Sequence, residues 1–138
     1  MDFPNLSTNP PNTKKILVVD DSLLDRKLLI RILKKAEIGN EIIQAENGEE
    51  ALAILANQYK DIGLILLDWQ MPKMSGIEMM EGVVKVPVVA SIPIIMVTAS
   101  GSDENKKYAW KVNPSLAGYL VKPYKPEALI EAVKRFLK

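Results

Sequence analysis

The sequence contains neither cysteine nor histidine among its 138 residues. Without cysteine, disulfide bonds, thiol catalysis and thiolate metal sites are excluded. Without histidine, the chain lacks the usual base at neutral pH and the commonest ligand of transition metals. Any metal ion bound by this chain must therefore be held by oxygen atoms, which favours magnesium, calcium or manganese.

A strong excess of charge and a long apolar stretch are also missing. The chain carries 18 basic and 17 acidic residues, so its composition gives no indication of binding to nucleic acid or to a membrane surface. No apolar run is long enough to cross a bilayer, and residues 1–13 do not resemble a signal peptide. We therefore expect a cytoplasmic protein with a disordered leader at 1–13, or alternatively a partner-binding arm there, and one folded domain at 14–138.

Short apolar runs alternate with helical patterns five times along the chain. Runs rich in valine, isoleucine and leucine predict buried strands at 15–19, 41–45, 64–67, 94–97 and 118–121. Amphipathic patterns predict helices at about 22–37, 48–58, 76–84 and 103–111, and a last helix from Pro126 onward. This alternation predicts the α/β class, a (βα)5 domain with a doubly wound parallel sheet of five strands and helices on both faces.

The first predicted helix begins after Ser22, a suitable N-cap residue. Leu24, Leu28 and Ile32 recur at intervals of four residues, so we expect them to face the core. The charged residues of this helix are expected mostly on the solvent side: Asp25, Arg26, Lys34 and Lys35.

Polar residues follow four of the five predicted strands, namely Asp20 with Asp21, then Asp68, Thr98 and Lys122. Alone, a carboxylate at a strand end is more simply explained as a turn residue. The carboxyl ends of parallel strands share one edge, however, and ligands bind at that edge. Clustered acids favour a Mg²⁺ ion, a lysine and a hydroxyl suit a phosphoryl group, and a carboxylate can accept one. Because the chain lacks histidine, a phosphohistidine donor would be another protein.

Four segments resemble the receiver domain of response regulators of the CheY type: Val18–Ser22, Leu67–Pro72, Val97–Ala99 and Gly118–Pro123. The resemblance covers about residues 14–138. It implies a flavodoxin-like sheet with the strand order 2-1-3-4-5. Because the chain ends with the last predicted helix, we expect a stand-alone receiver domain without an output domain.

The resemblance implies a role for each acid. Asp68 would accept the phosphoryl group from a sensor histidine kinase or a phosphotransfer protein. Asp21 and Asp68 would bind Mg²⁺ directly, together with the backbone carbonyl of Gln70, and Asp20 would assist through a water molecule. The protein would then be a phosphoacceptor in signalling and not an enzyme that turns over a substrate.

It also implies roles for residues around these acids. Thr98 would bond to a phosphoryl oxygen, and Lys122 would contact the phosphoryl group. The peptide bond between Lys122 and Pro123 would be cis, which only proline tolerates at low cost. Gln70 and Ser100 flank the site and would tune the lifetime of the phosphoryl group.

A switch residue and an output surface are implied as well. Tyr119 would change rotamer together with Thr98, on a face formed by the helix at 103–111, the strand at 118–121 and the last helix. A downstream protein would bind this face, and a homodimer is left open. The apolar valines at 83–89, broken by a proline, are a second candidate surface. The turn at 113–117 departs from the family pattern, which implies a reshaped helix or exit loop next to the proposed partner surface.

Three other functions are compatible with parts of this pattern. A phosphorelay shuttle or phosphate sink would use the same site but pass the group to another protein. A phosphohydrolase with an aspartate nucleophile typically has a second acid two residues later, where this chain has Gln70. A flavodoxin-like cofactor binder would have no reason to gather acids and a lysine at one edge.

Overall fold

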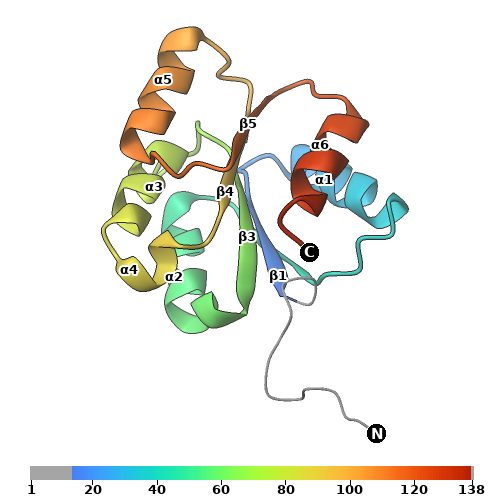
Figure 1. The fold of residues 1–138 in the computed structure, drawn as a ribbon, viewed down its shortest axis with the longest axis horizontal. Coiled ribbons are helices and arrows are strands. Elements are labelled where there is room, and N and C mark those ends of the chain that lie inside the picture. The colour runs from blue at the N-terminus through green and yellow to red at the C-terminus, as the bar shows by residue number, and fades with distance from the viewer. Residues whose placement is uncertain (1–13, 138) are drawn as a thin grey trace, which may run out of the picture.

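A parallel sheet of five strands forms the centre of the computed structural model (Figure 1). The strands are β1 (Lys15–Val19), β2 (Ile42–Ala45), β3 (Ile62–Leu67), β4 (Ile94–Thr98) and β5 (Gly118–Val121). Their order is β2-β1-β3-β4-β5, and every pairing is parallel, so the predicted fold is confirmed. The structure describes residues 14–137, and the leader predicted at 1–13 lies outside that range.

Helices cover both faces of the sheet. The helices are α1 (Leu23–Lys35), α2 (Gly48–Gln58), α3 (Gly76–Val84), α4 (Pro87–Ala90), α5 (Asp103–Val112) and α6 (Pro126–Lys134), with a 3-10 turn at Tyr59–Asp61. Figure 1 shows α1 and α6 on one face and the other four on the opposite face. The short helix α4 was not predicted; Pro87 occupies its first turn, where a missing N–H group costs nothing. None of the helices in residues 14–137 could span a bilayer.

The core consists of one apolar cluster on each face of the sheet, because alternate residues of a strand point to opposite faces. On one face, Leu29 and Leu33 of α1 pack with Leu129 and Val133 of α6. Each of these side chains contributes about 2 kcal/mol through burial. The packing holds the helix ends at the carboxyl edge of the sheet, where the predicted site residues lie.

The predicted orientation of α1 is wrong in its first two turns, whereas Ile32 packs against the core as expected. Leu24 and Leu28 are 76% and 52% exposed, whereas Leu29, Leu33 and Arg26 are buried. The helix carries apolar residues around most of its circumference, so periodicity alone does not select the inner stripe. Arg26 selects it, because its guanidinium donates to the backbone carbonyl of Asp20 at 2.5 Å and to Oε1 of Gln44 at 2.9 Å.

The apolar segment at 83–89 is divided between core and surface. Val83 and Val89 are buried, whereas Val86 and Val88 are exposed. In the turn at 113–117, Asn113 is buried and its side-chain oxygen accepts a hydrogen bond from the backbone N–H of Ser115 at 3.0 Å. This turn brings the chain from α5 into β5.

Candidate functional site

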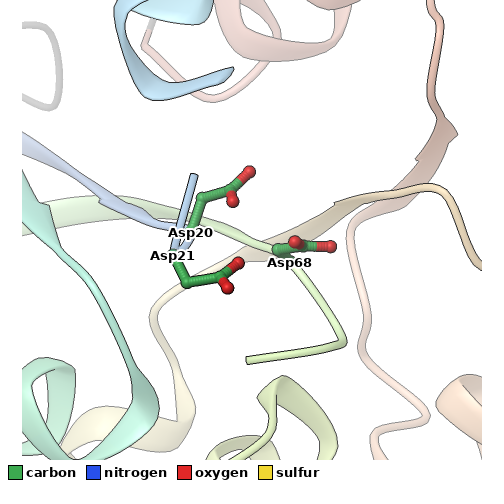
Figure 2. Close-up of side chains that lie close together, drawn as sticks. All are labelled: Asp20, Asp21 and Asp68. Carbon is green, nitrogen blue, oxygen red and sulfur yellow. The ribbon is translucent and has the colours of Figure 1, made fainter. Parts of the chain in front are cut away.

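Three carboxylates gather at the carboxyl edge of the sheet (Figure 2). Asp20 and Asp21 directly follow β1, and Asp68 follows β3. One oxygen atom from each carboxylate lies within 4.8 Å of the other two. Asp20 and Asp68 are buried, whereas Asp21 is exposed. An oxygen-only cluster of this kind, open to solvent on one side, fits a hard divalent cation such as Mg²⁺.

The backbone fixes the position of the two buried acids. The N–H group of Asp20 donates to the carbonyl of Ala45 at 3.0 Å, and that of Asp68 donates to the carbonyl of Val19 at 2.9 Å. The carboxylate of Asp68 accepts a hydrogen bond from the N–H of Trp69 at 2.8 Å. The ladder between neighbouring parallel strands therefore places Asp20 and Asp68 side by side before any ligand binds.

Lys122 reaches into this cluster from the end of β5. Its Nζ atom lies 2.6 Å from Oδ2 of Asp20 and 3.6 Å from Oδ2 of Asp68. It also lies 2.8 Å from Oδ2 of Asp25, a residue of α1 that we expected mostly on the solvent side. The peptide bond between Lys122 and Pro123 is cis, as predicted.

The environment raises the pKa values of both Asp68 and Lys122. Burial raises the pKa of Asp68, and the charge of Asp20 adds to this, while the Thr98 hydroxyl, Lys122 and the Trp69 N–H oppose it. Burial alone would lower the pKa of Lys122, but the hydrogen bonds that its ammonium donates to Asp20 and Asp25, together with the negative charge of Asp68, raise it. Lys122 is therefore cationic at every physiological pH.

Thr98, the last residue of β4, and Tyr119 of β5 both bond to Ser100 in the loop after β4. The buried Thr98 accepts a hydrogen bond at Oγ1 from the N–H of Ser100 at 3.2 Å. The phenolic O–H of Tyr119 donates to the backbone carbonyl of Ser100. Trp110 of α5 stacks on the ring of Tyr119, with 5.9 Å between ring centroids. Thr98 and Tyr119 are thus linked through one residue, Ser100.

The structure brings most of the predicted site residues together. Lys122 contacts both Asp20 and Asp68, and Asp21 completes the acidic cluster. Gln70 is an exposed residue of the loop that follows β3.

Sequence reasoning missed three residues around the site. Asp25 contacts Lys122, and Arg26 bonds to the carbonyl of Asp20. Gly76 begins α3 directly beside Asp68: a Cβ atom on Gly76 would lie 1.9 Å from the Asp68 carbonyl oxygen. The sequence contained a signal for two of these residues. Asp25 is an acid in the first turn of the helix that follows β1, and Gly76 directly follows the serine N-cap of α3.

The fold and the strand-end residues define a receiver domain. A model of the response regulator receiver domain family matches residues 16–134, and the chain belongs to this family.

Several known proteins are similar. The chain is 37% identical over 125 residues to the phosphate regulon transcriptional regulatory protein PhoB of Pseudomonas aeruginosa, covering 91% of this chain and 52% of that protein. The structure of chemotaxis protein CheY4 of Vibrio cholerae matches with a TM-score of 0.77 at 35% identity, covering 91% of this chain and 99% of that one. The Mn²⁺-bound form of response regulator Rcp1 matches with a TM-score of 0.73 at 30% identity, covering 88% and 90%. The chain thus spans about half the length of the PhoB relative.

Proposed function

We propose that this protein is a response regulator that accepts a phosphoryl group on Asp68. The donor is the phosphohistidine of a sensor histidine kinase or of a phosphotransfer protein, and Mg²⁺ is required. One observation carries the proposal: the buried Asp68 carboxylate lies within 4.8 Å of two further acids and 3.6 Å from Lys122. The protein acts as a phosphoacceptor in signalling, because membership of the receiver family supports that role and not substrate turnover. The cytoplasmic location stays a prediction.

In the proposed transfer, a carboxylate oxygen of Asp68 attacks the phosphorus atom of the donor. The phosphorus–nitrogen bond of phosphohistidine breaks, and its electron pair leaves with the imidazole. Mg²⁺, when bound, supplies charge that neutralises the phosphoryl oxygens. The proposal assigns it to Asp21, Asp68 and the carbonyl of Gln70, with Asp20 acting through water, and the Mn²⁺-bound form of Rcp1 supports a divalent ion.

Two further groups hold the phosphoryl oxygens in this proposal. Lys122 contributes a cation, and Thr98 contributes a hydroxyl at the end of β4. Gln70 and Ser100 flank the acceptor, and their effect on the lifetime of the phosphoryl group stays a prediction.

The proposed output surface is the face formed by α5, β5 and α6. Its support is the chain of contacts from Thr98 through Ser100 to Tyr119, with Trp110 stacked on the tyrosine. When Thr98 moves toward a phosphoryl oxygen, the carbonyl that Tyr119 binds moves with it. Phosphorylation would thereby shift the population of two conformations of this face and change the binding of a downstream protein. A homodimer is also left open, with the apolar segment at 83–89 as a candidate surface.

Acetyl phosphate tests the proposed acceptor directly, because it needs no partner protein. With Mg²⁺, the wild-type protein is expected to gain the mass of one phosphoryl group, through a bond that hydroxylamine cleaves as it cleaves acyl phosphates. With EDTA, labelling is expected to fall by at least about a hundredfold, because charge neutralisation at a transferring phosphoryl group contributes several kcal/mol. Metal-independent labelling, or a hydroxylamine-resistant bond, would contradict the proposal.

Leu24 provides a test of the protein donor. This exposed leucine lies in the first turn of α1, which follows the acids at the end of β1, and we expect an incoming phosphohistidine to approach that end of the helix. Leu24→Ser is expected to slow transfer from a phosphorylated phosphotransfer domain about tenfold, since an apolar interface residue contributes about 1–2 kcal/mol. Labelling by acetyl phosphate should stay at the wild-type rate. Val88→Ser, which changes another exposed apolar residue on α4, is the control; equal slowing by both variants would refute docking at Leu24.

A further inference from the structure

Lys122 is held by two close carboxylates, and one of them, Asp25, lies outside the acidic cluster. The Nζ atom is 2.6 Å from Asp20 and 2.8 Å from Asp25, but 3.6 Å from Asp68. A lysine ammonium carries three N–H donors, and these two short contacts occupy two of them. The acceptor carboxylate therefore has the weakest of the three contacts with the lysine.

The position of Asp25 in α1 usually serves another purpose. It is the third residue of the helix, from which an acid can accept a hydrogen bond from the N–H of the N-cap residue. In α3, Glu78 does so, at 2.9 Å from the N–H of Ser75. In α1, the equivalent N–H group of Ser22 donates to Asp20 instead, also at 2.9 Å. Since Asp20 accepts the hydrogen bond from the N–H of Ser22, the carboxylate of Asp25 is available to Lys122.

The ion pair of Asp25 with Lys122 lies at the boundary between the site and solvent. The side chain of Asp25 is 41% exposed and that of Lys122 is 18% exposed. Both line one end of a groove of about 360 Å³ between α1 and α6, whose other walls are mainly apolar. The pair can therefore open and close without disturbing the core, and its strength is that of a partly exposed salt bridge.

We propose that Asp25 is a positioning residue that holds Lys122 in the unphosphorylated protein and competes with the incoming phosphoryl group for its ammonium. This inference rests on the proposed acceptor role of Asp68. When acetyl phosphate is the donor, an Asp68 oxygen bonds to phosphorus, the bond from phosphorus to the acetyl oxygen breaks, and acetate leaves with the electron pair. The phosphoryl oxygens then require Lys122. The Asp25 carboxylate retains that ammonium and slows the transfer.

The test compares labelling rates by acetyl phosphate in the full chain with Mg²⁺. Asp25→Asn is expected to label about fivefold faster, the change that corresponds to the roughly 1 kcal/mol of a partly exposed ion pair. Asp25→Glu keeps the charge and should restore a rate near that of the wild type. Glu49→Gln removes an exposed acid from the first turn of α2 and should change nothing. In a Lys122→Met background, Asp25→Asn should no longer accelerate labelling, because its effect passes through the lysine.

A second readout needs neither donor nor metal. Thermal unfolding in EDTA of the wild type, Asp25→Asn, Lys122→Met and the double variant should show non-additive shifts. Additive shifts, a wild-type or slower labelling rate in Asp25→Asn, or an acceleration that persists without Lys122 would each overturn the inference. Its failure is distinct from failure of the proposed function, which would appear as a wild-type protein that acetyl phosphate does not label.

Discussion

Asp68→Asn is expected to abolish labelling by acetyl phosphate and, at the same time, to stabilise the metal-free protein. The amide lacks the nucleophilic carboxylate oxygen, so labelling should fall by at least about a hundredfold. The metal-free protein should gain on the order of 1 kcal/mol, or about 4 °C in its unfolding midpoint, because a buried charge beside Asp20 is removed. Mass spectrometry and thermal unfolding in EDTA measure the two effects on one sample.

The pH dependence of this stabilisation has a defined sign. Burial raises the pKa of Asp68 in the folded protein above its ordinary value, so the folded state binds more protons than the unfolded state between the two values. The stability that protonated Asp68 contributes is therefore present below the ordinary pKa and is lost as the pH rises through the raised pKa. The advantage of Asp68→Asn should be largest near neutral pH and should shrink as the pH falls through this window. Subtracting the two unfolding curves removes the contribution of carboxyl groups that do not interact with Asp68.

Asp61→Asn is the matched control. Asp61 is an exposed aspartate that directly precedes β3, whereas Asp68 directly follows this strand. This variant should label at the wild-type rate and unfold at the wild-type midpoint. Added Mg²⁺ should raise the midpoint of the wild type and of Asp61→Asn, since a ligand that binds only the folded state stabilises it. It should raise the midpoint of Asp68→Asn less. Undiminished labelling of Asp68→Asn would place the acceptor elsewhere in the chain.

The strand ends were predictable because a parallel sheet converts sequence position into spatial position. Asp20, Asp68 and Lys122 each follow an unbroken apolar run, and three such runs in one parallel sheet end at one edge. The chemistry of that edge therefore follows from the order of residues along the chain. The short helix α4 could not be predicted in this way, because Pro87 and the valines around it are compatible with either a turn or a helix.

The orientation of α1 was not predictable, because it depends on groups far apart in the sequence. Two leucine stripes are available, and the buried stripe is the one that lets Arg26 reach Gln44 of β2 and the end of β1. That orientation turns Leu24 to solvent and Asp25 toward Lys122. A polar contact, rather than the apolar pattern, thus decides which face of the helix serves the site.

Gly76→Ala is expected to destabilise the protein by about 3 kcal/mol, or roughly 10 °C in its unfolding midpoint. An added Cβ atom would lie 1.9 Å from the carbonyl oxygen of Asp68 and 3.0 Å from its carbonyl carbon. Both are backbone atoms, which cannot move aside as a flexible side chain would. The N–H of Gly76 also donates to the carbonyl of Trp69 at 2.8 Å, so retreat of the helix would break this bond. Thermal unfolding and labelling by acetyl phosphate measure the consequences.

Gly82→Ala is the matched control in the same helix, because nothing lies within 4 Å of the Cβ atom it would add. This change should be neutral or stabilising by up to about 1 kcal/mol, since alanine favours a helix over glycine. Labelling of Gly76→Ala should slow at least about tenfold, because a displaced Asp68 carbonyl moves the acceptor away from the acids that surround it. Equal stability and labelling of the two variants would show that the start of α3 does not set the position of Asp68. If Gly76→Ala were stable but slowly labelled, Gly76 would be needed for the position of Asp68 and not for the stability of the fold.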